Sequence, residues 1–192
     1  MKRRRAHTAV RATLLVVLAV LASCAGPARR LPALPNDPTG AIYLLGAGDS
    51  LRITVFGEAD LSGTFKISDN GALVMPLVGQ VKAQGLSIPD LQKKLVGLLN
   101  VKAVKSPDVT IQIEEYRPFF ILGEVKNPGS YPYVPEMTVL TAVAIAGGFT
   151  FRASQDEVSV TRKLNGTPLE ARATRESRVL PGDVVYVFER HF

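Results

Sequence analysis

The sequence predicts an α+β protein made of two small domains, in which short strands outnumber helices. Apolar and polar residues alternate over short runs such as residues 51–55 and 109–114, which is typical of half-buried strands. Only residues 88–99 carry leucines at the spacing of a long amphipathic helix. Asn-Gly and Pro-Gly pairs separate these stretches. With 192 residues and 46% apolar residues, the chain can form one core or two small ones.

The basic excess of the sequence lies at its N-terminus. The formal net charge is +6, but five basic residues and no acidic residue fall within residues 1–23. Without that segment, 18 basic residues face 17 acidic ones. Because the segment has the features of a cleaved signal, we do not expect a nucleic-acid partner.

Few residues are available for metal binding or catalysis. Cys24 is the single cysteine, which excludes an internal disulfide framework and a cysteine-rich zinc site. His7 and His191 lie at opposite ends of the sequence, so neither a histidine metal site nor a histidine-based triad is expected. No pair of carboxylates has a spacing that favours acid–base chemistry. We therefore predict a protein that is not an enzyme and has no catalytic residue, cofactor or metal.

Residues 1–23 have the organisation of a secretory signal. A basic segment precedes the apolar run of 10 residues at 12–21, which is shorter than the about 20 residues a membrane-spanning helix needs. The run ends in Leu-Ala-Ser-Cys at residues 21–24, which resembles the bacterial lipobox. That resemblance implies cleavage between Ser23 and Cys24 and attachment of lipid to Cys24. The alternative is a plain secreted protein with an incidental cysteine.

Residues 24–42 are predicted to form a tether between the lipid and the folded part. Four prolines interrupt regular structure there and favour an extended spacer. Ala25 follows Cys24, where an aspartate would suggest retention in the inner membrane. We therefore expect a lipid anchor in the outer membrane, with the folded part facing the periplasm.

The first folded segment is predicted to open with a turn at residues 46–49 and a strand at 51–55. Residues 65–74 predict a hairpin that turns at Asn70-Gly71, and another short strand follows at 77–81. Ser87 begins a helix with a variant of the capping box. The apolar stripe of this helix comprises Leu91, Leu95, Leu98 and Leu99.

The second folded segment begins with a predicted strand at residues 119–122. Pro128 and Gly129 favour a type II turn, after which Tyr131 resumes the extended chain. Thr138 is expected to cap a short helix that Gly147-Gly148 ends. The face shared within that helix is predicted to comprise Leu140, Val143 and Ala144.

Further strands are predicted after this helix. A strand at residues 158–162 is followed by a hairpin turn at 164–168 and a closing strand at 184–188. The closing strand follows Leu-Pro-Gly-Asp at residues 180–183, which echoes Gly-Ala-Gly-Asp at 46–49. We interpret the two as the same turn-to-strand device used twice.

Two sets of motifs resemble known modules. Gly-Glu-Val-Lys-Asn-Pro-Gly at residues 123–129 and Ala-Gly-Gly at 146–148 resemble the soluble-ligand-binding β-grasp module. Residues 45–55, 69–79 and 106–111 resemble the polysaccharide-export domain. Their order matches the polysaccharide export protein family, which implies a polysaccharide-export domain at 43–117, a small mixed sheet with one main helix, and a β-grasp domain at 118–192. The alternative is a hairpin and helix from another α+β domain.

The resemblance implies a component of a capsular or exopolysaccharide export complex. Its folded part would form, or contribute to, a homo-oligomeric ring through which polysaccharide passes, docked on an inner-membrane co-polymerase. Longer members carry a second β-grasp module and a C-terminal helix, so the resemblance is to a short form. The alternative is a monomeric glycan-binding or sensing module, with Arg117, Lys126 and Asn127 as candidate contacts, although turn or strand-edge roles suit them better. An enzyme that trims polysaccharide would need a catalytic dyad in a cleft.

Overall fold

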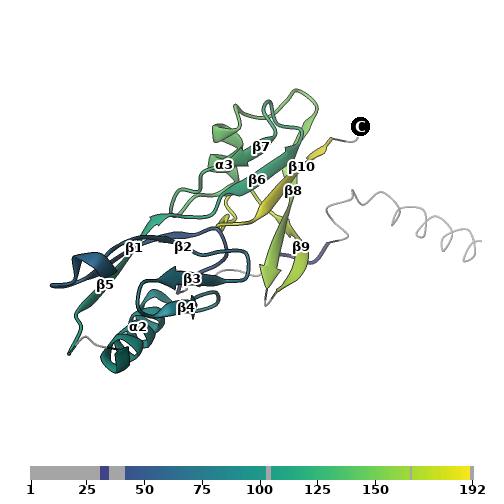
Figure 1. Ribbon diagram of the computed structural model, residues 1–192. Helices are drawn as coiled ribbons and strands as arrows, with labels where there is room; N and C mark the ends of the chain where they lie inside the picture. Colours follow the sequence, from purple (N-terminus) through teal and green to yellow (C-terminus); the bar gives the residue numbers. More distant parts are fainter. Residues whose placement is uncertain (1–30, 35–41, 103–104, 165, 191–192) are drawn as a thin grey trace, which may run out of the picture.

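The computed structural model describes residues 31–34, 42–102, 105–164 and 166–190. Strands β1 to β5 and helix α2 gather in one body, and strands β6 to β10 and helix α3 gather in another (Figure 1). Each body has its own cluster of buried apolar side chains. This arrangement confirms the predicted α+β class.

The first domain is built on a three-stranded antiparallel sheet of order β2-β1-β5. These strands are β1 (Ser50–Val55), β2 (Gly63–Lys66) and β5 (Val109–Glu115), with the short 3-10 helix η2 (Ala59–Leu61) between the first two. A separate antiparallel hairpin comprises β3 (Ala72–Met75) and β4 (Gly79–Lys82), and the helix is α2 (Ile88–Lys102). The alternation in β1 buries Leu51, Ile53 and Val55 on one face.

Helix α2 confirms its predicted start and most of its predicted stripe. The Ser87 hydroxyl accepts the Asp90 N–H (3.2 Å) and donates to the Asp90 carboxylate (2.6 Å), which satisfies a backbone donor of the first turn. Leu91, Leu95 and Leu99 are fully buried, whereas Leu98 is only partly buried against the same core. The centre of the buried stripe is therefore formed by residues spaced four apart, at positions 91, 95 and 99, and Leu98 lies at its edge.

The predicted hairpin at residues 65–74 is wrong. The chain does reverse at Asn70-Gly71, but β2 pairs with β1 and β3 pairs with β4. The Asn70 side chain accepts bonds from the Ser68 hydroxyl and the Ala72 N–H, which closes a local loop. The Gly71 carbonyl then accepts the N–H groups of two residues that follow β4, at 3.0 and 2.9 Å. These bonds direct β3 toward β4 and away from β2.

The second domain is a five-stranded mixed sheet of order β7-β6-β10-β8-β9 with α3 packed on one face. Its strands are β6 (Phe119–Gly123), β7 (Gly129–Tyr131), β8 (Ala153–Leu164), β9 (Thr167–Ala173) and β10 (Val184–Glu189), and its helix is α3 (Val139–Ile145). Strands β6 and β10 are parallel, and the other neighbours are antiparallel. The pairing of Leu164 with Thr167 confirms the hairpin predicted at 164–168.

The predicted type II turn at Pro128-Gly129 is wrong. That turn needs a positive φ at Gly129, but Gly129 belongs to β7 and pairs with Ile121, and its φ is not positive. The reversal is instead spread over residues 124–128. The N–H groups of Lys126 and Asn127 donate to the carbonyls of Gly148 and Ala146, each at 3.0 Å. The two β-grasp motifs are therefore hydrogen-bonded to each other.

Gly123 explains why the first of these motifs begins with glycine. Its φ is +85°, and a Cβ at this position would lie 2.1 Å from the Val187 carbonyl oxygen of β10. The same carbonyl accepts the Glu124 N–H at 3.0 Å. Only a residue without a side chain allows the two backbones to approach this closely.

Helix α3 has the predicted cap and end but a different buried face. Thr138 accepts the Thr141 N–H, and Gly147 and Gly148 have φ values of +85° and +94°. The buried residues are Val139, Ala142, Val143 and Ala146, whereas Leu140 is 50% exposed. Of the predicted face, Val143 is buried, but Leu140 and Ala144 are exposed. Bonds from the N–H groups of residues 139 and 140 to the carbonyls of Ser177 and Arg175 set the rotation of the helix.

Several predictions about the N-terminus lie outside the described residues, including those on Ser23 and Cys24. Within the predicted tether, however, residues 31–34 are described, and Ala33 pairs with Arg172 of β9. This short part of the tether is thus bound to the second domain. Among the described residues, no helix has the length and apolar character needed to cross a membrane.

Candidate functional site: the domain junction

Two turns of the same construction meet at the junction of the domains. In residues 46–49 the Asp49 carboxylate accepts the Gly46 N–H at 2.8 Å, and in residues 180–183 the Asp183 carboxylate accepts the Leu180 N–H at 2.8 Å. Each aspartate also donates its own N–H to the carbonyl three residues earlier, at 3.2 and 3.1 Å. The structure confirms that one turn-to-strand device is used twice.

Both aspartates are buried and each is paired with an arginine. Asp49 is 0% exposed and accepts the Arg117 N–H at 2.9 Å and Arg117 Nη1 at 3.0 Å. Asp183 is 1% exposed, and its two oxygens accept bonds from Arg162 Nε and Nη2 at 2.8 to 3.2 Å. Burial raises the pKa of Asp183 above its ordinary value, and the bonds from Arg162 oppose that rise.

Arg117 connects the two turns. Its guanidinium donates through Nη1 to the Asp49 carboxylate and the Tyr43 hydroxyl on one side, and through Nε to the Pro181 carbonyl (2.9 Å) on the other. A Cβ on Gly182 would lie 2.8 Å from Nε, so the second turn fits closely against this side chain. Only three residues separate β5 from β6. Arg117 therefore joins the two domains directly, and the linker between them is short.

Three tyrosines form a ladder beside Arg117. The rings of Tyr43 and Tyr116 are 5.2 Å apart and those of Tyr116 and Tyr133 are 5.3 Å apart, both edge to face. Tyr43 belongs to the first domain and Tyr133 to the second. The ladder therefore spans the junction with favourable aromatic contacts.

Tyr43 makes the stability of this junction sensitive to alkaline pH. Burial and the bond to Asp49 raise the pKa of Tyr43 above its ordinary value of 10.0. Above pH 10 the unfolded chain releases this proton while the folded protein keeps it, so the free energy of unfolding falls as the pH rises. We expect Tyr43→Phe to cost about 1 kcal/mol near pH 7. We also expect it to flatten the fall in urea-measured stability between about pH 10 and 11.5, where an unfolded tyrosine ionises.

Tyr186→Phe is the control for that measurement, because Tyr186 lies on the face of β10 opposite α3 and is 43% exposed. Its free energy of unfolding near pH 7 should be close to that of the wild type, because the exposed hydroxyl bonds to water in both states. An unchanged alkaline slope in Tyr43→Phe would contradict the role assigned to this hydroxyl.

The three predicted glycan contacts do not form one cluster. Arg117 precedes β6 and is engaged in the junction, whereas Lys126 and Asn127 are exposed beyond the other end of β6. The latter two use their backbone N–H groups to bind the end of α3. The repeated Gly-Asp turn was visible in the sequence, but its arginine partners were not, because they lie 68 and 21 residues away.

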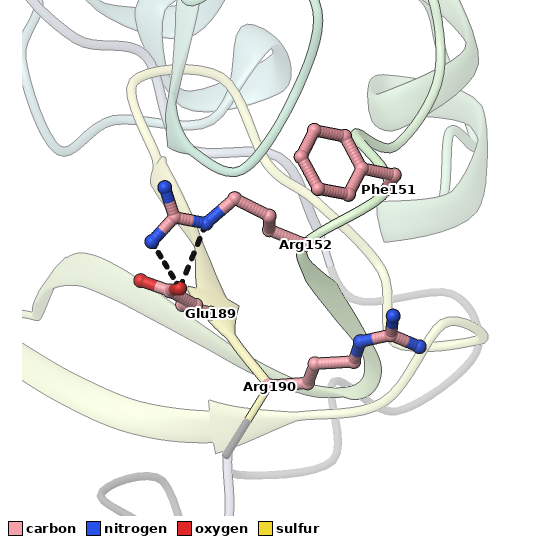
Figure 2. Close-up of a pocket in the computed structure, with 4 residues that line it drawn as sticks. All are labelled: Phe151, Arg152, Glu189 and Arg190. Carbon is pink, nitrogen blue, oxygen red and sulfur yellow. Dashed lines mark hydrogen bonds and ion pairs between the residues drawn. The ribbon is translucent and has the colours of Figure 1, made fainter. Parts of the chain in front are cut away.

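A second feature is a pocket of about 310 Å³ where β8 begins and β10 ends. Phe151, Arg152, Glu189 and Arg190 line it, and Figure 2 shows Arg152 directed at Glu189. Arg152 Nε donates to Glu189 Oε1 at 2.8 Å, and a second bond comes from Nη2. Within the described residues, no group of three or more histidine, cysteine, aspartate or glutamate side chains is placed to bind a metal.

Two family models match this chain. The model described as polysaccharide biosynthesis/export protein matches residues 37–114, and the SLBB domain model matches residues 118–172. The chain belongs to the polysaccharide export protein family. Tyr116 and Arg117 fall in the short gap between the two matches. The family consists of export proteins and not of enzymes, which agrees with the prediction from the sequence.

Curated relatives also match part of this chain. The exopolysaccharide production protein ExoF of Rhizobium meliloti is 33% identical over 123 residues, covering 55% of this chain and 28% of that protein. The polysialic acid transport protein KpsD of Escherichia coli is 27% identical over 108 residues, covering 55% of this chain and 19% of that protein. The chain thus matches about a quarter and a fifth of the lengths of these two relatives.

Proposed function

We propose that this protein is a lipid-anchored component of a capsular or exopolysaccharide export complex at the outer membrane, facing the periplasm. Its folded part contributes to a ring through which the polysaccharide passes, and the ring docks on an inner-membrane co-polymerase. The names of ExoF and KpsD, which refer to exopolysaccharide production and polysialic acid transport, support the substrate class. Cys24 is the proposed site of lipid attachment.

The observation that carries this proposal is the ionic junction around Arg117. A ring of defined size needs subunits of fixed shape, because a flexible pair of domains could not repeat one angle around an axis. The bonds from Arg117 to Tyr43, Asp49 and Pro181 give the domain pair such a shape.

The exposed apolar residues of the second domain supply a surface for subunit contact. The outer-sheet patch comprises the exposed residues Phe120, Leu122 and Tyr186 and the partly buried Phe188, on the face of β6 and β10 opposite α3. Leu122 pairs with Tyr186 across the two strands, and these residues are 45% and 43% exposed. The rings of Tyr186 and Phe188 lie 5.0 Å apart. Contiguous apolar surface of this kind is typical of interaction sites.

The first domain has exposed apolar residues of its own. Val74 of β3 is 66% exposed, and Leu77 in the turn after β3 is 63% exposed. A head-to-tail ring requires two different surfaces on each subunit. Each domain carries one exposed apolar surface, and Arg117 holds the two domains in a fixed arrangement. The subunit therefore meets that requirement.

The test is the mass of the full-length lipoprotein extracted in detergent. We expect the wild type to be an oligomer and Leu122→Glu to be a monomer, because a charge in the outer-sheet patch would be buried without a partner. Leu164→Glu is the matched control, since Leu164 is 43% exposed but lies outside the patch, and it should remain oligomeric. A uniform wild-type monomer at micromolar concentration would overturn the ring and favour the monomeric glycan-binding alternative.

A further inference from the structure

Residues 31–34 lie along the free edge of β9, the last strand of the five-stranded sheet. The Leu34 N–H donates to the Arg172 carbonyl at 2.8 Å, and the Arg172 N–H donates to the Pro32 carbonyl at 2.7 Å. Ala33 and Arg172 form a parallel bridge, and Figure 1 shows this segment beside β9. Leu34 also packs against the core of the second domain. The segment therefore adds one parallel bridge, with two backbone hydrogen bonds, to the edge of the sheet.

The sequence of this segment suits a short strand at an edge. Pro32 and Pro35 have no N–H, so Pro32 contributes a carbonyl to the pairing but no donor. Proline is tolerated in sheets mainly at edges. The pairing satisfies both backbone groups of Arg172, which would otherwise be open to another chain. The edge of β9 is thus protected at Arg172 by the chain itself.

We propose that this docking fixes the side of the protein that faces the membrane. The inference rests on the proposed lipid attachment at Cys24. Leu31 is seven residues after Cys24, so an extended chain would span at most about 25 Å. Without docking, the first anchored point would be near Ile42, 18 residues after Cys24, at a reach of about 60–65 Å.

The consequence is that the β9 edge of the second domain lies close to the membrane. Chain order alone would favour the first domain, because it follows the tether directly. Because residues 31–34 are bound to β9, the chain from the lipid anchor contacts the second domain before it reaches the first domain. Each subunit is held by the same strand edge, which gives all subunits one orientation relative to the lipid surface.

The docking is tested by disulfide formation in membranes containing the full-length lipoprotein. Ala33→Cys with Arg172→Cys should give an intrachain disulfide, seen as a faster-migrating species that reduction removes. The control pairs Ala33→Cys with Ser130→Cys on β7, at the opposite edge of the same sheet, and should give no cross-link. Absence of the first disulfide, or its formation between two chains, would overturn the docking.

The orientation is tested by energy transfer from a protein label to acceptor lipids in vesicles. We expect a label at Glu170→Cys on β9 to transfer at least twice as efficiently as one at Lys93→Cys on α2. Leu34→Pro removes the N–H that binds Arg172, and Leu34→Asp places a charge against the core, so either should reduce that ratio toward one. Equal transfer from the two labels in the otherwise native protein would overturn the orientation.

Cys24→Ser separates the failure of this inference from the failure of the anchor. Release of Cys24→Ser from membranes supports the lipid attachment on which the orientation depends. Retention of Cys24→Ser in membranes would overturn the anchor and the orientation with it. The disulfide result for residues 33 and 172 stands in either case, because it depends only on the pairing with β9.

Discussion

Replacing Arg162 by methionine is expected to lower the free energy of unfolding by about 3–5 kcal/mol, because the substitution leaves a buried carboxylate without its partner. Asp183 is 1% exposed and Arg162 is 8% exposed, so water cannot replace the lost bonds. Burial already raises the pKa of Asp183, which indicates that desolvation of this carboxylate exceeds the stabilisation by its partners. Urea unfolding at neutral pH measures the loss.

The double variant Arg162→Met/Asp183→Asn should be more stable than the sum of the two single changes predicts. It removes both charges, and the asparagine side chain can still accept the Leu180 N–H that Asp183 binds at 2.8 Å. The matched control is the exposed pair of Arg52 and Glu114, with side chains 58% and 32% exposed. Arg52→Met should cost only about 0–1 kcal/mol. Equal losses in Arg162→Met and Arg52→Met would contradict the assigned role.

Replacing Arg117 by methionine is expected to uncouple the domains while each remains folded. The substitution keeps the aliphatic stem and the backbone N–H that Asp49 accepts, but it removes the side-chain bonds to Asp49, Tyr43 and Pro181. We expect a loss of about 2–4 kcal/mol, since a buried carboxylate and a carbonyl lose charged donors. Unfolding should change from one transition to two.

The distance between the domains is a second measurement of the effect of Arg117→Met. Spin labels at Lys93→Cys on α2 and Glu170→Cys on β9 should show a narrow distribution in the otherwise native protein and a broad one with Arg117→Met. Arg52→Met is the control, because it removes an exposed arginine from the first domain only. A variant with native stability and a narrow distribution would favour a glycan-contact role for Arg117 and argue against the junction.

Arg117→Met also tests the link between the junction and the ring. If fixed domain geometry is needed for assembly, Arg117→Met should lose the oligomer although its outer-sheet patch is intact. Leu122→Glu should lose the oligomer with the domain distance unchanged. The two variants therefore separate the shape of the subunit from the surface through which it associates.

Sequence patterns predicted those parts of the structure in which neighbouring residues determine one another. The alternation in residues 51–55 and 109–113 predicted the inward faces of β1 and β5. Ser87 and Thr138 marked the helix starts because a hydroxyl three residues before a free N–H can bind it locally. The two Gly-Asp turns were recognisable for the same reason, since each aspartate binds a residue only three positions away.

The errors arose where a segment has more than one locally acceptable arrangement. Pro128-Gly129 suits a type II turn, but pairing with Ile121 extends β7 through Gly129. Asn70-Gly71 is compatible with a hairpin, but β2 pairs with β1 and β3 pairs with β4 in a different sheet. The seven residues of α3 offer two apolar faces, and contacts from residues 175 and 177 select one.

By itself, the sequence determined the α+β class, the strand patterns, the helix caps and the motifs by which the chain belongs to its family. Only the tertiary structure decided that Arg117 joins the domains, that Arg162 pairs with Asp183 and that residues 31–34 dock on β9. The physical reason is distance along the chain. Alternation, caps and turns act between residues a few positions apart, whereas these bonds join residues whose proximity depends on the whole fold.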